Sequence, residues 1–203
     1  CGEMSLETER FNIDEKIKHS ILSCVGNTPL IKINISPYVS ENVEIYAKLE
    51  YFNPGGSIKD RPVLRMITEA IKSGKLTHDK VVLDSTSGNA GIAYAMIGAA
   101  LGFQVELVIP GNASEERKQS IRAFGAHIIT TDPIKGYDEA IKKAHELYEE
   151  NPKKYFMPDQ YSNRHNPMAH YDTTGKEILK QTRGKVTHFI CGVGTGGTVM
   201  GVG

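Results

Sequence analysis

Between residues 80 and 150, short runs rich in β-branched residues alternate with longer runs that have helical spacing. This alternation constrains the fold more than any other feature, because strands that alternate with helices form a mostly parallel sheet covered by helices on both faces. The sequence therefore predicts an α/β protein with three layers, αβα, whose ligands bind beyond the carboxyl ends of the strands. The expected strands are 80–84, 103–109, 127–130 and 186–191, and the expected helices are 89–101, 112–125 and 137–150.

Residues that favour helix ends support these boundaries. Gly102 and Gly125 are suited to end the first two helices, because glycine readily adopts the left-handed conformation of a C-cap. Asn112 is followed three positions later by Glu115, which is the spacing of a capping box. We therefore expect Asn112 to cap the second helix.

Charge, cysteine content and hydropathy argue against several classes of function. Lys plus Arg and Asp plus Glu number 24 each, so no net basic field attracts nucleic acid or an anionic membrane. The three cysteines form no CxxC pair and the histidines form no HExxH motif, so we expect no metal site and a reducing, cytoplasmic location. No apolar stretch is long enough to span a bilayer.

The segment 53–62, NPGGSIKDRP, precedes a further helical pattern. Its two adjacent glycines allow a tight turn, and Pro62 suits the first turn of a helix. Lys59 therefore lies at a helix N-terminus, where the positive end of the dipole disfavours an ammonium group. This placement favours a neutral amine that forms an imine or acts as a base. An exposed lysine in an ordinary turn fits the same spacing.

Two further motifs each connect an expected strand to an expected helix. Residues 85–91, STSGNAG, combine hydroxyl groups with successive backbone N–H groups, which suit a carboxylate but also fit an ordinary N-capping turn. Residues 192–198, GVGTGGT, let the backbone approach a phosphate closely. Gly192, Gly194 and Gly197 also satisfy the GxGxxG pattern of dinucleotide-binding proteins, which is a weak signal by itself.

In their order and spacing, these motifs resemble the fold-type II pyridoxal-phosphate (PLP) enzymes, which have the tryptophan synthase β-like fold. The chain is most similar to the cysteine synthase and cystathionine β-synthase family, from about residue 25 to its last residue. The resemblance depends on VGNTPL at 25–30, NPGGSIKDR at 53–61, TSGNAG at 86–91 and GVGTGGT at 192–198.

The resemblance implies a role for each matching residue. Lys59 matches the lysine that holds PLP as a Schiff base and acts as acid and base, and Asn89 matches the residue that hydrogen-bonds the ring 3′-oxygen. The phosphate would rest on the loop formed by Gly194, Thr195, Gly196, Gly197 and Thr198. The substrate carboxylate would be held by Thr86, Ser87, Gly88 and Gln160.

The resemblance also implies two small domains with the cofactor in the cleft between them. Residues 20–52 with 164–203 would belong to the larger cofactor domain, and 53–163 would form a smaller mobile substrate-binding domain. We expect a homodimer, because family members are commonly homodimers. The chain stops at Gly203 where a helix should continue, so we expect the C-terminal portion to be missing, together with the partner of the pyridine nitrogen.

The implied activity is a β-replacement that forms L-cysteine from O-acetylserine or O-phosphoserine and sulfide. The alternative within the family is cystathionine β-synthase, which joins serine and homocysteine, a thiol. Two alternatives from other classes are an NAD-dependent dehydrogenase and a non-catalytic fragment that does not hold PLP. One departure from the family pattern is Ala90, which stands where a threonine is usual and removes one hydroxyl from the carboxylate loop.

Overall fold

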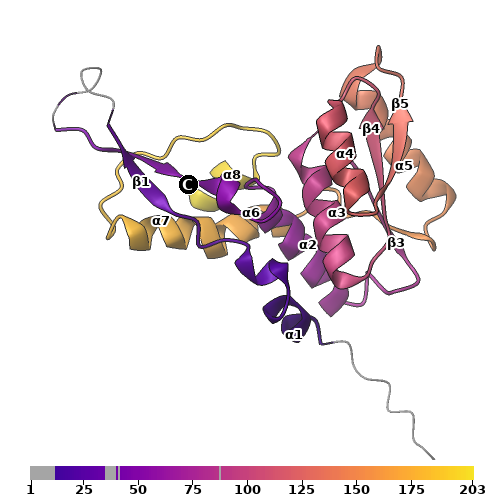
Figure 1. Cartoon of the computed structure of the whole chain (residues 1–203), viewed down its shortest axis with the longest axis horizontal. Coiled ribbons are helices and arrows are strands. Elements are labelled where there is room, and N and C mark those ends of the chain that lie inside the picture. The colour runs from indigo at the N-terminus through magenta and orange to yellow at the C-terminus, as the bar shows by residue number, and fades with distance from the viewer. Residues whose placement is uncertain (1–11, 35–39, 41, 87) are drawn as a thin grey trace, which may run out of the picture.

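The structure is a computed structural model that describes residues 12–34, 40, 42–86 and 88–203. Two lobes lie side by side (Figure 1). One lobe holds the main sheet with α3, α4 and α5, and the other holds β1, α6, α7 and α8. Helix α2 (Asp60–Lys72) lies between the two lobes and contacts both α3 and α6. The lobes are therefore joined through the helix that begins directly after Lys59.

The main sheet has four parallel strands in the order β5-β4-β3-β6. These strands are β3 (Val81–Ser85), β4 (Val105–Pro110), β5 (His127–Thr131) and β6 (Tyr155–Phe156). Every residue of β3 is buried, as expected for a central parallel strand covered on both faces. The carboxyl end of β3 leads directly into the segment that contains Thr86.

Helices cover both faces of this sheet, and alternate strand residues point to alternate faces. Val82 and Leu107 pack with α2, α3 (Asn89–Leu101) and α4 (Glu115–Ala123) on one face. Leu83 and Val108 pack on the other face against Ala140 and Ala144 of α5 (Gly136–Glu150). The predicted α/β class with its αβα layers is confirmed.

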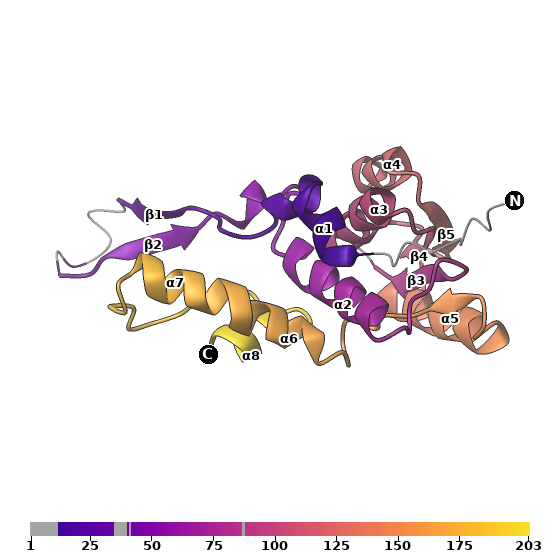
Figure 2. The ribbon, with the colours of Figure 1, turned by 90° about the horizontal axis from the view of Figure 1, so that it is seen from below.

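The second lobe is built from shorter elements (Figure 2). An antiparallel pair, β1 (Leu30–Ile33) and β2 (Ile45–Lys48), lies beside a long helical segment made of three parts. These parts are α6 (His165–His170), a π-helical turn (Tyr171–Gly175) and α7 (Lys176–Gln181). Helix α8 (Gly197–Val202) crosses α6, with Gly201 directly against the Pro167 carbonyl. The remaining short helices are α1 (Ile13–Lys18), η1 (Ile21–Cys24) and η2 (Glu50–Phe52).

The structure corrects one predicted helix boundary and one predicted strand. Helix α4 begins at Glu115 with Ser114 at the N-cap, so the predicted cap at Asn112 is wrong. The reason is a turn closed by a hydrogen bond from the Ala113 N–H to the Pro110 carbonyl, which delays the start of the helix. The predicted strand at 186–191 is also wrong, because no described strand pairs with it and Ile190 is 92% exposed. The other predicted strands and helices are present.

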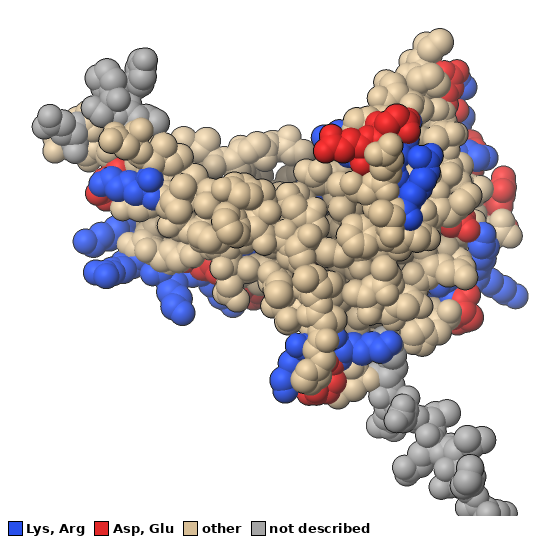
Figure 3. Space-filling model, in the orientation of Figure 1, with Lys and Arg blue, Asp and Glu red and all other residues tan. Residues whose placement is uncertain are grey.

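On the face shown in Figure 3, charged residues of both signs lie mainly near the edges, and the centre carries few charges. Among the described residues, no helix has the length and apolar character required to cross a membrane. The described residues also contain no group of three or more His, Cys, Asp or Glu side chains that could hold a metal ion.

Truncation of a buried strand residue tests the packing of the main sheet. We expect Leu107→Ala to lower the free energy of unfolding by about 2–5 kcal/mol, because Leu107 is fully buried and its loss leaves a cavity. Leu179→Ala is the matched control, since Leu179 is 55% exposed and its loss leaves no cavity. Urea unfolding curves measure both changes, and equal effects would contradict the assigned core.

Candidate functional site

Lys59 lies at the N-cap position of α2, at the end of a tight turn. Gly56 has a φ of 81°, and the Gly55 N–H donates to the Asp60 carboxylate, which closes the turn. The Lys59 N–H donates to Ser57 Oγ over 3.1 Å. The Lys59 side chain is half-buried, and this burial lowers its pKa. The turn thus presents an amine with a reduced tendency to carry charge.

His170, the last residue of α6, contacts the glycine-rich turn. It is 1% exposed, and burial, followed by the positive charges of Arg61 and Lys59, lowers its pKa to about 4. Its Nδ1 lies 3.0 Å from Thr174 Oγ1, and its Nε2 lies 3.5 Å from Thr198 Oγ1. His170 thus contacts the third motif through Thr198, and α6, the helix that carries it, packs against both α2 and α8.

Thr86 organises the turn at the carboxyl end of β3. Its Oγ1 accepts the N–H groups of Gly88 at 3.1 Å and Gly91 at 3.2 Å, and the side chain is 2% exposed. In this structure the Thr86 hydroxyl therefore closes its own turn. Asn89, the first residue of α3, is exposed. Ser87 lies outside the described residues.

Gln160 lies beside the same strand end, although it is far away in the sequence. It is 6% exposed, and its Nε2 donates to the Ser85 carbonyl at 3.4 Å. The same carbonyl accepts a hydrogen bond of 3.1 Å from Tyr137 Oη. The structure thus brings Gln160 and the Thr86 turn together, as a shared carboxylate site requires. Arg117, which was not singled out from the sequence, approaches the same turn and lies 3.8 Å from a Cβ built on Gly88.

The glycine-rich turn connects the extended segment to α8. Gly196 has a φ of 80°, which favours glycine, and Gly197 starts the helix. A Cβ at Gly197 would collide with the Asn166 side chain, whereas Gly192 and Gly194 have open space around them. Thr195 Oγ1 accepts a hydrogen bond of 2.8 Å from Asn166 Nδ2. The turn therefore offers hydroxyl groups and first-turn N–H groups that have no partner within the helix, and such groups suit an anion.

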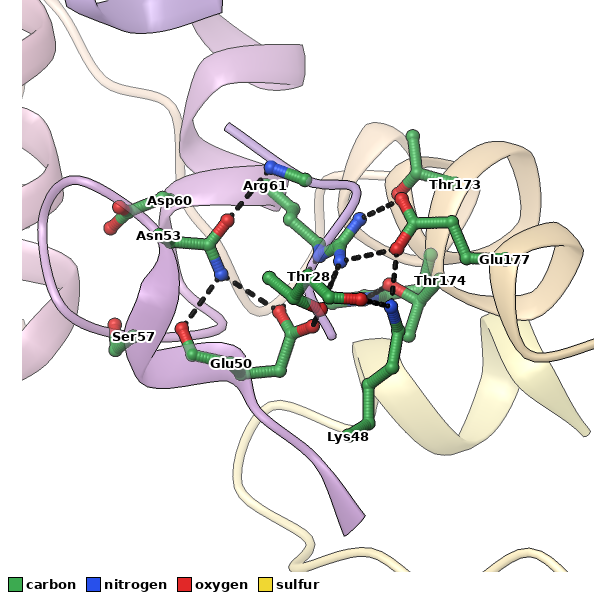
Figure 4. A network of polar contacts seen from close by, with 12 residues as sticks. Thr28, Lys48, Glu50, Asn53, Ser57, Asp60, Arg61, Thr173, Thr174 and Glu177 are labelled. Atoms are coloured by element: carbon green, nitrogen blue, oxygen red, sulfur yellow. Dashed lines mark hydrogen bonds and ion pairs between the residues drawn. The ribbon is translucent and has the colours of Figure 1, made fainter. Parts of the chain in front are cut away.

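A buried ion cluster fixes the turn that carries Lys59 (Figure 4). Arg61, whose side chain is 1% exposed, donates to Glu50 at 2.7 Å and to Glu177 at 2.7 Å. Lys48 donates to Glu177 and to the Thr28 carbonyl, both at 2.6 Å. Burial raises the pKa of Glu177, but hydrogen bonds from Arg61 and Lys48 outweigh it and lower the pKa to about 2.

Sequence reasoning did not single out this cluster, nor the buried Asp84, Asn166 and His170. A usable signal exists only for Asp84, because a charged residue inside a β-branched strand requires a partner. That partner is Tyr94, whose hydroxyl donates to Asp84 at 2.6 Å. The other residues come from segments that the sequence alone does not place side by side.

Known proteins show the same organisation. The model of the family described as "Pyridoxal-phosphate dependent enzyme" matches residues 21–203. Cysteine synthase of Aquifex aeolicus is 54% identical over 190 residues, which are 93% of this chain and 58% of the relative. Cysteine synthase B of Salmonella typhimurium is 45% identical over 88% of this chain and 58% of its own length.

Solved structures agree with this similarity. The crystal structure of a hydrogen sulfide-producing enzyme from Fusobacterium nucleatum superposes with a TM-score of 0.85 at 47% identity. The match covers 91% of this chain and 60% of that structure. The chain thus spans about 58% of the length of the curated relatives that it matches.

The ion cluster around Arg61 is tested by removing one of its charges. We expect Glu177→Gln to lower the free energy of unfolding at pH 7 by about 3 kcal/mol, because it leaves buried cations incompletely paired. The carboxylate stabilises the fold above its unfolded pKa of 4.5, and this stabilisation is lost as the pH falls towards about 2. The difference between variant and wild type should therefore shrink below pH 4.5.

Urea unfolding at pH 7, 5, 4 and 3 measures this effect. Glu146→Gln is the control, since its ion pairs with Lys142 and Lys143 lie on the surface, where such pairs contribute little. A Glu177→Gln variant as stable as wild type at pH 7 would show that the cluster does not stabilise the turn.

Proposed function

The chain belongs to the pyridoxal-phosphate dependent enzymes, and from this premise we propose that its protein makes L-cysteine by β-replacement. The proposed substrates are O-acetylserine or O-phosphoserine together with sulfide. Similarity to cysteine synthases supports this activity. The observation that carries the proposal is the packing of α6 against both α2, which begins directly after Lys59, and α8, which begins at the glycine-rich turn.

The residues present fit PLP. Open space at Gly192 and Gly194 leaves room for close approach of a phosphate, and the Thr195 and Thr198 hydroxyls are available to bind it. We assign the phosphate to Gly194, Thr195, Gly196, Gly197 and Thr198. When bound, PLP supplies an aldehyde that reacts with amines and a ring that withdraws electrons from the Cα of an amino acid.

Within this proposal, Lys59 Nζ would hold PLP through its aldehyde and would move the proton at Cα of the amino acid. Its lowered pKa suits both tasks, because only the neutral amine is a nucleophile or a base. Asn89 is exposed at the start of α3, where its amide is available to donate to the ring 3′-oxygen. His170 stays neutral near neutral pH and adds no charge beside the phosphate.

We assign the substrate carboxylate to Thr86, Ser87, Gly88 and Gln160. This assignment is supported by the contact between Gln160 and Ser85, which brings two distant segments to one strand end. Fixing the carboxylate orients the Cα–H bond toward the base. We further propose that 53–163 moves as the smaller substrate-binding domain against 20–52 and 164–203. The homodimer and the cytoplasmic location stay predictions.

Replacement of Lys59 tests the covalent role of its amine. We expect Lys59→Ala to lose covalent PLP and turnover, because no other amine occupies this turn. Borohydride reduction followed by peptide mapping should place the pyridoxyl group on Lys59 in the wild type. Lys75→Ala, which removes an exposed lysine, should behave like the wild type. A pyridoxyl group on Lys48 or any other lysine would contradict the assignment.

A matrix of donors and acceptors tests the reaction. The protein is offered O-acetylserine, O-phosphoserine and serine, each with sulfide or homocysteine, and kcat/KM is compared. We expect the highest value for sulfide with one of the two activated donors. The highest value for serine with homocysteine would instead identify a cystathionine β-synthase.

A further inference from the structure

Asn166 joins the segment that carries Gln160 to the glycine-rich turn. It is the second residue of α6 and is 3% exposed. Its Nδ2 lies 2.8 Å from the Gln160 carbonyl oxygen and 2.8 Å from Thr195 Oγ1. A single buried amide group therefore touches both a candidate carboxylate residue and a candidate phosphate residue.

The direction of these hydrogen bonds is fixed by chemistry. A backbone carbonyl only accepts, so the atom that faces the Gln160 carbonyl is the nitrogen of the amide and not its oxygen. The second N–H of the same nitrogen then donates to Thr195 Oγ1. Both donors of Asn166 are used, and each goes to a different part of the site.

Packing holds the amide in this position. Gly197 lies so close to the Asn166 side chain that a Cβ there would overlap Oδ1 and Cγ. Oδ1 is buried without a hydrogen-bond partner among the described residues. A buried acceptor without a partner is costly, so the two donated bonds and the contact with Gly197 must outweigh that cost. The side chain and the turn are therefore fitted to each other.

The contact continues from Gln160 to the carboxyl end of β3. Gln160 donates to the Ser85 carbonyl, and the Ser85 N–H donates to the buried Asp84 carboxylate at 2.8 Å. Asp84, Ser85, Gln160 and Asn166 are each at least 94% buried, which shields the bonds between them from water. A hydrogen-bonded path thus runs from Asp84 through Gln160 and Asn166 to Thr195.

We infer that Asn166 is a positioning residue that couples the amino-acid carboxylate site to the cofactor phosphate turn. This inference rests on the proposed function. Phosphate binding at Thr195 orders the hydroxyl that Asn166 contacts, and Asn166 transmits this order to the Gln160 backbone. The amino acid is then held firmly only when the cofactor is present.

Cofactor titration and hydrogen exchange test this coupling. The cofactor-free protein is titrated with PLP, and amide exchange is followed with and without PLP. In the wild type, PLP should slow exchange at 194–198 and also at 158–163 and 85–86. Asn166→Ala should weaken PLP binding about tenfold, because a buried donor is lost, and should confine the slowed exchange to 194–198.

Asn163→Ala is the matched control. Asn163 lies in the same segment. Its side chain donates to the Pro158 carbonyl and accepts from the His165 N–H, so both bonds stay within residues 158–165. We expect this variant to bind PLP like the wild type and to keep the slowed exchange at 85–86. If Asn166→Ala does not fold, the exchange pattern of the wild type alone decides, because protection limited to 194–198 would overturn the coupling.

The outcomes separate this inference from the proposed function. A wild-type protein that binds no PLP would overturn the proposed function. A wild type that binds PLP, with an Asn166→Ala variant equal to it in both affinity and exchange, would overturn only the coupling by Asn166. At saturating PLP, the KM for the amino acid should also be higher in Asn166→Ala than in the wild type. If this variant changed only in melting temperature, Asn166 would have a merely structural role.

Discussion

The structure depends on one buried cation, Arg61, two positions after the proposed catalytic lysine. Its guanidinium is held by Glu50 from one side and Glu177 from another, and Lys48 restores charge balance. A guanidinium in this setting remains charged, and its planar group bonds two carboxylates at once. The start of α2, the β1–β2 pair and α7 are thereby tied together, so the turn that carries Lys59 is fixed from the side of the second lobe.

The parallel sheet fixes the same site from the opposite side. Strand β3 ends in Asp84 and Ser85, and Thr86 follows it directly. Asp84 accepts from the Ser85 N–H, the Ser85 carbonyl accepts from Tyr137, and Thr86 accepts from the Gly88 N–H. Burial raises the pKa of Asp84 to about 7, although hydrogen bonds from Tyr94 and the Ser85 N–H oppose this rise. A carboxyl group placed so deeply has its polar partners built into the fold, so the end of β3 supports the turn that begins at Thr86.

Periodicity in the sequence predicted the sheet because each central strand is buried on both faces and each helix has a small or apolar face. The same reasoning failed at 186–191, since an apolar run becomes a strand only when a neighbouring strand accepts its hydrogen bonds. The motifs correctly predicted that Lys59 lies at the start of a helix and that the glycine-rich turn leads into one. They could not reveal Asn166 or the Arg61 cluster, because those contacts join residues up to 129 positions apart.

The π-helical turn between α6 and α7 has a consequence for how this protein tolerates changes in length. The turn inserts one extra residue into an otherwise continuous helical segment, between the Asn166 and His170 side and the Glu177 side. Removal of one residue there would rotate everything after it by about 100°. Glu177 would then face away from Arg61 while Asn166 kept its place, so this short stretch sets the angular phase between Asn166 and Glu177.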